Sequence, residues 1–133
     1  MNAVREQIRS SLISEPRQGG FRARFRLSPD FPLLPDHFPS QPIFPGICML
    51  QAVLLAGAAA RGVPDLHLSQ LKNSKLLQPI RPGDELMIDA DMTRDDAGNG
   101  DIAIKARLSV GGEKRAEFSL VAREPAAGAG AAA

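Results

Sequence analysis

The sequence contains a single cysteine, Cys48, among its 133 residues. A disulfide framework and a zinc site made of several cysteines are therefore both excluded within one chain. Neither sign of charge is in clear excess, since the chain has 16 basic and 15 acidic residues and a net charge of +1. This balance leaves no electrostatic footprint for nucleic acid or for an anionic membrane surface.

Long hydrophobic runs are missing as well. The longest, residues 52–60, is far shorter than the ~20 residues of a membrane-spanning helix. The first residues, MNAVREQIRSS, lack the apolar core of a signal peptide. We therefore expect a soluble, cytoplasmic protein that binds neither nucleic acid nor a membrane. We also expect one domain over residues 1–124 and a disordered Ala/Gly tail over 125–133.

Proline, by contrast, is concentrated in one stretch. Residues 29–45 hold 6 of the chain's 11 prolines. Repeated X-Pro steps disfavour a helix and favour extended or turn geometry, so this stretch is predicted to be an ordered irregular loop. Such loops often carry functional residues, which makes His37 a candidate site residue. A purely structural loop histidine is the alternative.

The loop leads into GICMLQAVLLAGAAARG, residues 46–62. This segment shows no strand alternation and is rich in helix-forming residues, which predicts a helix that ends at Gly62, with Pro64 beyond it. The helix is apolar nearly all round, so other structure must cover it. Its side chain Gln51 is polar within an otherwise apolar sequence. We consider a buried amide that satisfies backbone groups and a ligand-facing amide equally.

The rest of the chain predicts mainly strands. Apolar and polar residues alternate in 20–28, 85–93, 101–110 and 114–123, as expected for strands with one buried face. Residues 66–77 alternate imperfectly, and the phase slip near Gln70–Leu71 indicates a β-bulge. A weakly amphipathic helix is expected over 3–13. Together these elements predict an α+β fold in which an antiparallel sheet wraps around one long central helix.

The loop and the start of the helix resemble a known motif. Hot-dog-fold 3-hydroxyacyl-acyl carrier protein dehydratases of the FabZ type carry H-F-P-G-x-P-x-x-P-G, then four residues, then Glu-Ala. The corresponding residues here are His37, Phe38, Pro39, Pro42, Pro45, Gly46 and Ala52. The turn IRPGDEL, residues 80–86, also looks like a segment of that family. The resemblance extends over residues 20–123 and implies a hot-dog fold.

The resemblance also implies roles for individual residues. His37 is the general base, and the backbone N–H groups of Gly46 and Ile47 hold the thioester oxygen. Phe38 and Pro45 contribute to substrate binding. The implied substrate is a thioester of acyl carrier protein or coenzyme A, and the reaction needs no metal or organic cofactor. The resemblance also implies a homodimer in which each site lies between the two subunits. A higher oligomer is an alternative.

Two positions depart from the family motif. Ser40 replaces a glycine, which is a mild change, but Gln51 stands where the family has its carboxylic acid. An amide can hydrogen-bond in both directions but cannot release a proton in the useful pH range. Because a general acid contributes about 10²–10⁴ in rate, Gln51 is expected to position a hydroxyl group or a water without replacing the acid.

Three functions remain open on these residues. The first is a dehydratase-like protein that eliminates water from a 3-hydroxyacyl thioester to give a 2-enoyl thioester, with Gln51 in place of the acid. The second is a non-catalytic acyl-binding or partner subunit that has lost the acid. The third is a thioesterase in which His37 or Gln51 directs water at the carbonyl. A substitute acid near the site would favour the first.

Several further residues have a structural and a functional interpretation. Cys48 is either a small buried hydrophobic residue or a thiol whose pKa is lowered by the helix start. His67 is expected at the surface or behind the site, and Asp36 is expected to cap or orient the loop rather than to act as an acid. The candidates for an acyl tunnel, which would serve equally well as core, are Phe38, Phe44, Met49 and Leu54.

Arginines alternate with apolar residues in the first predicted strand. Arg22, Arg24 and Arg26 share the face opposite to Phe21 and Phe25. They form either a solvated strand face or a docking stripe for an acidic carrier protein.

Overall fold

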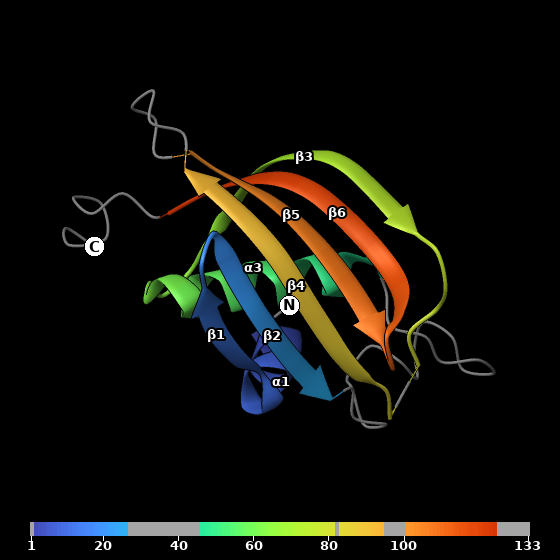
Figure 1. Cartoon of the computed structure of the whole chain (residues 1–133). Coiled ribbons are helices and arrows are strands. Elements are labelled where there is room, and N and C mark those ends of the chain that lie inside the picture. Colours follow the sequence, from blue (N-terminus) through green and yellow to red (C-terminus); the bar gives the residue numbers. More distant parts are fainter. Residues whose placement is uncertain (1, 27–45, 82, 95–100, 125–133) are drawn as a thin grey trace.

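The computed structural model describes residues 2–26, 46–81, 83–94 and 101–124 (Figure 1). Within these ranges the strands form one 6-stranded antiparallel sheet of order β1-β2-β4-β5-β6-β3. The elements, in chain order, are α1 (Asn2–Ser11), β1 (Ile13–Arg17), β2 (Gly20–Arg26), α3 (Gly46–Arg61), β3 (His67–Leu76), β4 (Glu85–Arg94), β5 (Asp101–Val110) and β6 (Glu113–Arg123).

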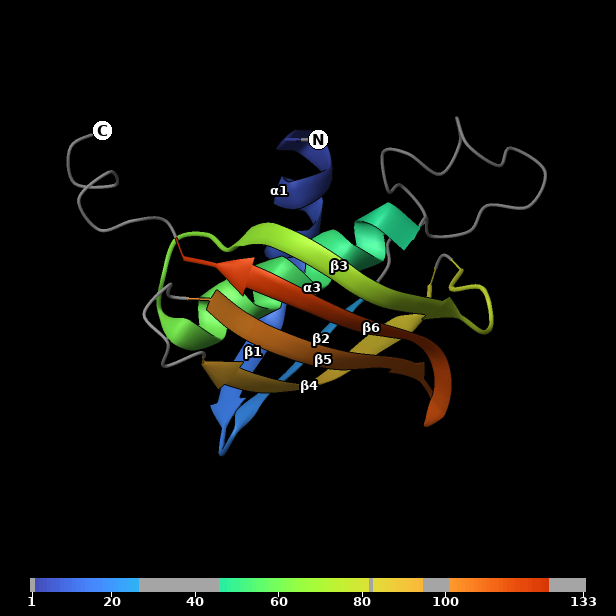
Figure 2. The ribbon, with the colours of Figure 1, turned by 90° about the horizontal axis from the view of Figure 1, so that it is seen from above.

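The sheet curves around α3, which lies on its concave face (Figures 1 and 2). The α1 helix packs on α3 and covers part of the side that faces away from the sheet (Figure 2). This arrangement confirms the predicted α+β fold with a sheet wrapped around one long helix. The observed helix α3 ends one residue before the predicted boundary at Gly62.

The core lies between α3 and the concave face of the sheet. Strand residues of one parity are buried there, because each strand presents every second side chain to the helix. The largest fully buried strand side chains are Phe21, Leu86, Ile88, Ile102, Ile104 and Leu108. Each such side chain stabilises the fold by about 1.5–3 kcal/mol relative to its exposed state. Their positions confirm the alternation that predicted β2, β4 and β5, and the buried residues Ala116, Phe118, Leu120 and Ala122 confirm it for β6.

The β3 strand differs from the other predicted strands. It pairs with β6 at the far edge of the sheet and not with β4, its neighbour along the chain. The predicted bulge is confirmed, since the register shifts between Leu68 and Gln70, and shifts again between Leu71 and Asn73. All ten residues of β3 are exposed, including those on the helix side.

Strand β1 was not predicted, and Ile13, expected at the end of the first helix, is its first residue. Pro16 and the charged neighbours of the strand hide the period of two that reveals the others. Proline is tolerated because β1 is an edge strand and pairs on one side with β2 through a two-residue turn at Gln18–Gly19. Gly19 has a φ of 76°, a conformation that favours glycine in such turns.

None of the helices in the described ranges has the length and apolar character required to cross a membrane.

Candidate functional site

The start of α3 forms the described part of the candidate site. The helix begins at Gly46, and the first N–H groups of an α-helix have no partner within the helix. These donors, with the positive end of the helix dipole, favour negative charge at this position. A Cβ atom on Gly46 would lie 3.3 Å from Leu76 Cδ1, so the glycine lets the helix start approach the end of β3 closely.

Gln51 lies one and a half turns into α3 and is half-buried. Its neighbours Leu50 and Ala52 are buried in the core, so the amide is placed by a rigid, closely packed helix. The helix contains no aspartate or glutamate along its length. If a carboxylic acid takes part in the chemistry, it must therefore come from another element or another chain.

The connection between β3 and β4 follows Leu76, the residue whose side chain lies near Gly46 at the helix start. Its residue Ile80 is fully buried, and the Asp84 carboxylate accepts a hydrogen bond of 2.8 Å from the Arg81 backbone N–H. Arg115 of β6 donates from Nη1 to the Pro79 carbonyl oxygen at 2.8 Å. Its own carbonyl oxygen accepts from the N–H groups of Leu77 and Gln78. Arg115 therefore holds this connection in place, a role that sequence reasoning missed.

Part of the predicted site lies outside the described residues. His37, Phe38 and Pro45 belong to the stretch 27–45, as do Asp36 and Phe44. Of the predicted site, the structure places Gly46, the backbone of Ile47 and Gln51, all on α3. The proposed pairing of His37 with position 51 stays a prediction. Met49 and Leu54, considered as tunnel residues, are buried in the core.

Cys48 is a buried core residue and not an activated thiol. Its side chain is 0% exposed, and burial raises its pKa to about 11. The suggestion that this pKa is lowered is therefore wrong, because loss of hydration on burial has the largest influence on it.

His67 lies at the surface, which is one of the two positions predicted for it. Its side chain is 66% exposed, and its Nε2 atom is 3.8 Å from an Asp65 carboxylate oxygen. His67 begins β3, whereas Leu76 beside the helix start ends it. At about 3.3 Å per residue, the two positions are roughly 30 Å apart. His67 therefore lies far from the candidate site.

The three arginines of β2 face solvent, but acidic residues interrupt the stripe. Arg22 lies between Glu15 of β1 and Asp89 of β4, with 3.9 Å between its Nε and an Asp89 oxygen. Arg26 is opposite Glu85 on the neighbouring strand. Arg24 has apolar cross-strand neighbours, Ile13 and Met87. The register therefore favours a solvated, partly ion-paired strand face over a docking stripe.

A charged network on the outer face of the sheet was not predicted. Arg17 contacts Asp89 at 3.0 Å and Asp91 at 2.7 Å, and it also donates to the Ala90 carbonyl oxygen at 2.9 Å. Arg107 contacts the other oxygen of each carboxylate at 3.3 Å. These residues are up to 90 positions apart in sequence, so only the strand register reveals the network.

The network lowers the pKa values of both carboxylates. Burial raises the pKa of Asp89, but hydrogen bonds and charges from Arg17 and Arg107 outweigh it, and the net pKa is lowered. Hydrogen bonds from Arg17 and then Arg107 lower the pKa of Asp91. Both groups are thus charged at neutral pH, and they join β1, β4 and β5. Their role is structural, since neither can serve as a proton donor at that pH.

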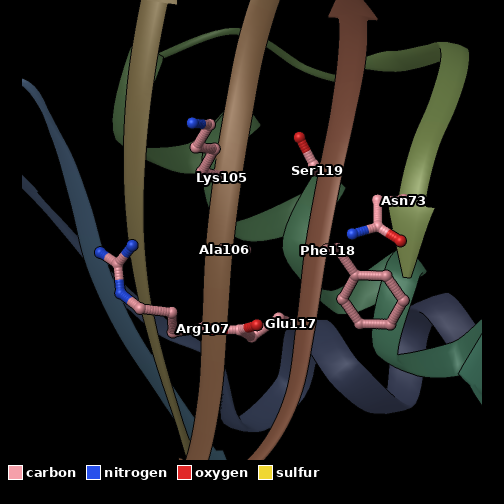
Figure 3. A pocket seen from close by; sticks show the side chains of 7 residues that line it. All are labelled: Asn73, Lys105, Ala106, Arg107, Glu117, Phe118 and Ser119. Carbon is pink, nitrogen blue, oxygen red and sulfur yellow. The ribbon is translucent and has the colours of Figure 1, made fainter. Parts of the chain in front are cut away.

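A pocket of about 290 Å³ lies on the outer face, over β3, β5 and β6 (Figure 3). Lys105, Ser119 and Asn73 line it, and the Arg107 side chain extends from it toward β4 (Figure 3). The Glu117 carboxylate, also in its lining, is paired with Lys114 at 2.6 Å. Because the pocket is on the face opposite α3, it is separate from the candidate site at the helix start.

Comparison with known proteins identifies the family. Residues 14–114 match the ApeI-like family, described as ApeI dehydratase. The chain belongs to this family. The match includes β1 to β5, the proline-rich loop and α3, so it contains every predicted site residue.

Proteins with similar sequences are also named as dehydratases. The 3-hydroxyacyl-[acyl-carrier-protein] dehydratase FabZ of a Thermus thermophilus strain is 30% identical over 115 residues, which cover 81% of this chain and 80% of the relative. The FabZ of Aeromonas hydrophila is 26% identical and covers 77% and 78% of the two chains. The resemblance to FabZ-type dehydratases is thereby confirmed.

Solved structures with this fold have diverse functions in their names. The dehydratase heterocomplex ApeI:P of Xenorhabdus doucetiae aligns with a TM-score of 0.62 and 19% identity, covering 82% of this chain and 91% of that chain. The PaaI protein of Escherichia coli aligns with a TM-score of 0.64, 12% identity and coverages of 92% and 88%. A thioesterase superfamily protein of Shewanella loihica aligns with a TM-score of 0.57, 19% identity and coverages of 86% and 90%. At these identities the likeness shows the hot-dog fold alone.

Proposed function

We propose that this chain binds a 3-hydroxyacyl or 2-enoyl thioester and catalyses slow dehydration of the hydroxy form. The observation that carries the proposal is a helix start at Gly46 that offers backbone donors at a residue with no side chain of its own. In the loop before it stands His37, within a motif that matches FabZ-type dehydratases. The carrier is acyl carrier protein or coenzyme A.

The chemistry assigns a separate task to each group. His37 removes the proton α to the thioester carbonyl, and a neutral imidazole is available for this near pH 7. The N–H groups of Gly46 and Ile47 stabilise the negative charge that develops on the carbonyl oxygen. The Cα–Cβ double bond forms as the β C–O bond breaks, and the hydroxide that leaves must gain a proton. Gln51 can orient that hydroxyl group but cannot protonate it, which makes the reaction slow.

We infer that the working form is a homodimer of single hot-dog domains, residues 1–124. The family resemblance implies that each site takes His37 from one subunit and position 51 from the other. A homodimer would then hold two sites, each with a base and an amide and without the acid of the family.

A second function is a subunit that binds acyl chains without catalysis. The absence of any carboxylate on α3 favours this function, because a related chain could then supply the acid. The dehydratase ApeI:P from Xenorhabdus doucetiae is named as a heterocomplex and supports this alternative. The thioesterase alternative is supported by the fold of the Shewanella protein alone.

Turnover of a 3-hydroxyacyl thioester, followed by enoyl absorbance in both directions, tests the proposal. We expect slow turnover by the wild type and its loss in His37→Ala. A thiol reagent in a parallel assay would report free coenzyme A or carrier thiol, which only a thioesterase releases. Enoyl formation that His37→Ala leaves unchanged, or thiol release without enoyl formation, would contradict the proposed dehydration.

A further inference from the structure

The outer face of the sheet carries a row of alternating charges. The row crosses β2, β4, β5, β6 and β3, and its cross-strand partners are, in that order, Arg22, Asp89, Arg107, Glu117 and Lys75. Each of these charges has an opposite charge on the neighbouring strand, an arrangement that stabilises strand pairs. The row is therefore balanced by its own residues.

The next row along the strands begins with charges but ends without them. Each of its members lies two positions from a member of the first row, and from β4 to β3 they are Asp91, Lys105, Ser119 and Asn73. Continued alternation would require an acid at position 119, opposite Lys105. A serine stands there, and the next residue across is an asparagine. Both side chains can donate hydrogen bonds, but neither carries a charge.

Lys105 is a cation that this row leaves without an ion pair. The Asp91 carboxylate opposite it is bound by two arginines, of which Arg17 is the nearer at 2.7 Å. Within the part of the chain that the structure describes, the side chains of Lys105, Ser119 and Asn73 make no ion pair or hydrogen bond. An ammonium, a hydroxyl and an amide group are thus all available to a ligand.

These three side chains line one pocket. Lys105 on β5, Ser119 on β6 and Asn73 on β3 lie on adjacent strands around the hollow of about 290 Å³ on the outer face (Figure 3). Directly opposite residues have Cβ atoms about 4.5–5.5 Å apart, so the short Ser119 side chain leaves room between its two longer neighbours. The volume is at the lower end of the range for small-ligand sites, which suits a compact group and not a nucleotide.

We propose that this pocket binds a small oxyanion of the phosphate type, with Lys105 as the cation and with Ser119 and Asn73 as hydrogen-bond donors. The oxyanion takes the place that an acidic side chain has in the neighbouring row. Lysine binds phosphate as a point charge, and hydroxyl and amide groups donate to phosphate oxygens. The site lies on the face opposite α3, so it is separate from the thioester site proposed at the helix start.

The acid at the edge of the pocket does not oppose an anion. Glu117 is paired with Lys114 at 2.6 Å. The hydrogen bond and the charge of Lys114, and then the charge of Lys75, lower the pKa of Glu117 although loss of hydration acts in the opposite direction. The positive field that keeps this carboxylate ionised also favours a second anion close to it.

Titration of the full chain with inorganic phosphate, followed by two-dimensional NMR of the backbone N–H groups, tests the proposal. Sodium chloride keeps the ionic strength constant, because salt screens exposed charges. The wild type is compared with Lys105→Gln and Ser119→Ala. Arg24→Gln is the matched control, since it removes one positive charge from the same face at a residue with apolar cross-strand neighbours. Sodium acetate in a parallel titration separates phosphate from anions in general.

We expect saturable shifts at residues 73, 105 and 119 in the wild type and in Arg24→Gln. Lys105→Gln should weaken phosphate binding by about 10-fold or more and Ser119→Ala by about 5-fold, since they remove a charged and a neutral donor respectively. Acetate should bind more weakly than phosphate.

Shifts that do not saturate in the wild type would overturn the proposal. Equal weakening by Arg24→Gln and Lys105→Gln would also overturn it, as would acetate binding that is as tight as phosphate binding. The same spectra show whether each variant is folded. None of these results depends on turnover, so failure of this proposal and failure of the proposed dehydration are distinguishable.

Discussion

The two edges of the sheet are constructed in opposite ways. The β1 edge has five residues and includes Pro16, Glu15 and Arg17, features that natural proteins use to prevent strand pairing. Ser14 Oγ also donates to the Ala56 carbonyl oxygen of α3 at 2.8 Å and ties this edge to the helix. The β3 edge has ten exposed residues and a strip of leucines. One edge is blocked by its own sequence, and the other leaves ten exposed residues, leucines among them.

The comparison is tested most strongly by a charge placed on each edge. We expect the second subunit of the proposed homodimer to cover the exposed leucines of β3. Leu71→Asp would bury a carboxylate there, so the dissociation constant of the dimer should rise by on the order of 100-fold. Ile13→Asp, at a residue that is 50% exposed on β1, should leave it unchanged. Sedimentation over a range of concentrations measures both. An equal effect of the two variants would show that the edges do not differ in function.

Next to the β1 edge, the backbones of β2 and β4 approach each other closely at Gly20. A Cβ atom there would lie 1.9 Å from the Ala90 carbonyl oxygen, so Gly20→Ala forces the backbones of β2 and β4 apart. We expect a loss of about 2 kcal/mol or more in the free energy of unfolding. Gly19→Ala is the matched control, with no atom near the added Cβ and only its φ of 76° as a cost. It should lose about 1 kcal/mol. Denaturant unfolding measures both, and equal losses would contradict the steric explanation.

The Arg17 network should make the β1 edge sensitive to acid. The pKa values of Asp89 and Asp91 are lowered in the folded state, so their charged forms contribute stability that is present above about pH 4. This contribution is lost as the pH falls through the lowered values. Arg17→Met should therefore lower Tm by a few degrees at pH 7 and by less at pH 3. Arg24→Met, which removes an exposed arginine from β2, should have little effect at either pH.

Cys48 should show the smallest effect, because its thiol does not react in the folded chain. Its thiol is buried, and burial raises its pKa to about 11. An aromatic disulfide reagent should find no reactive thiol in the folded wild type between pH 7 and pH 9, and should find one after denaturation. Rapid reaction in the folded state would show that the start of α3 opens.

The sequence predicted those elements whose pattern follows from burial on one face. Strands β2, β4, β5 and β6 alternate because each has one side against α3, and the helix is apolar apart from Gln51 and the final Arg61. Strand β1 was missed since Pro16 and its charged neighbours conceal that alternation. The place of β3 at the far edge also could not be predicted, because alternation does not reveal which strands are neighbours.

The candidate site was predictable to a different extent. The lack of strand alternation and the helix-forming residues placed Gly46 and Gln51 on one helix, and the structure confirms this placement. Arg115 could not be identified, because its contact with Pro79 joins residues that are far apart along the chain. The network of Arg17 with Asp89 and Asp91 likewise depends on the register of three strands. Such contacts follow from topology, which no local pattern contains.

The central claim is that this site is a dehydratase site without its acid. The most direct test measures the dehydration rate of Gln51→Glu beside that of the wild type. The account predicts slow wild-type dehydration and a gain of about 10²–10⁴ in rate when the carboxylic acid is restored. Gln18→Glu, in the exposed turn after β1, controls for the added charge. A folded Gln51→Glu variant that is no faster than the wild type would contradict the account.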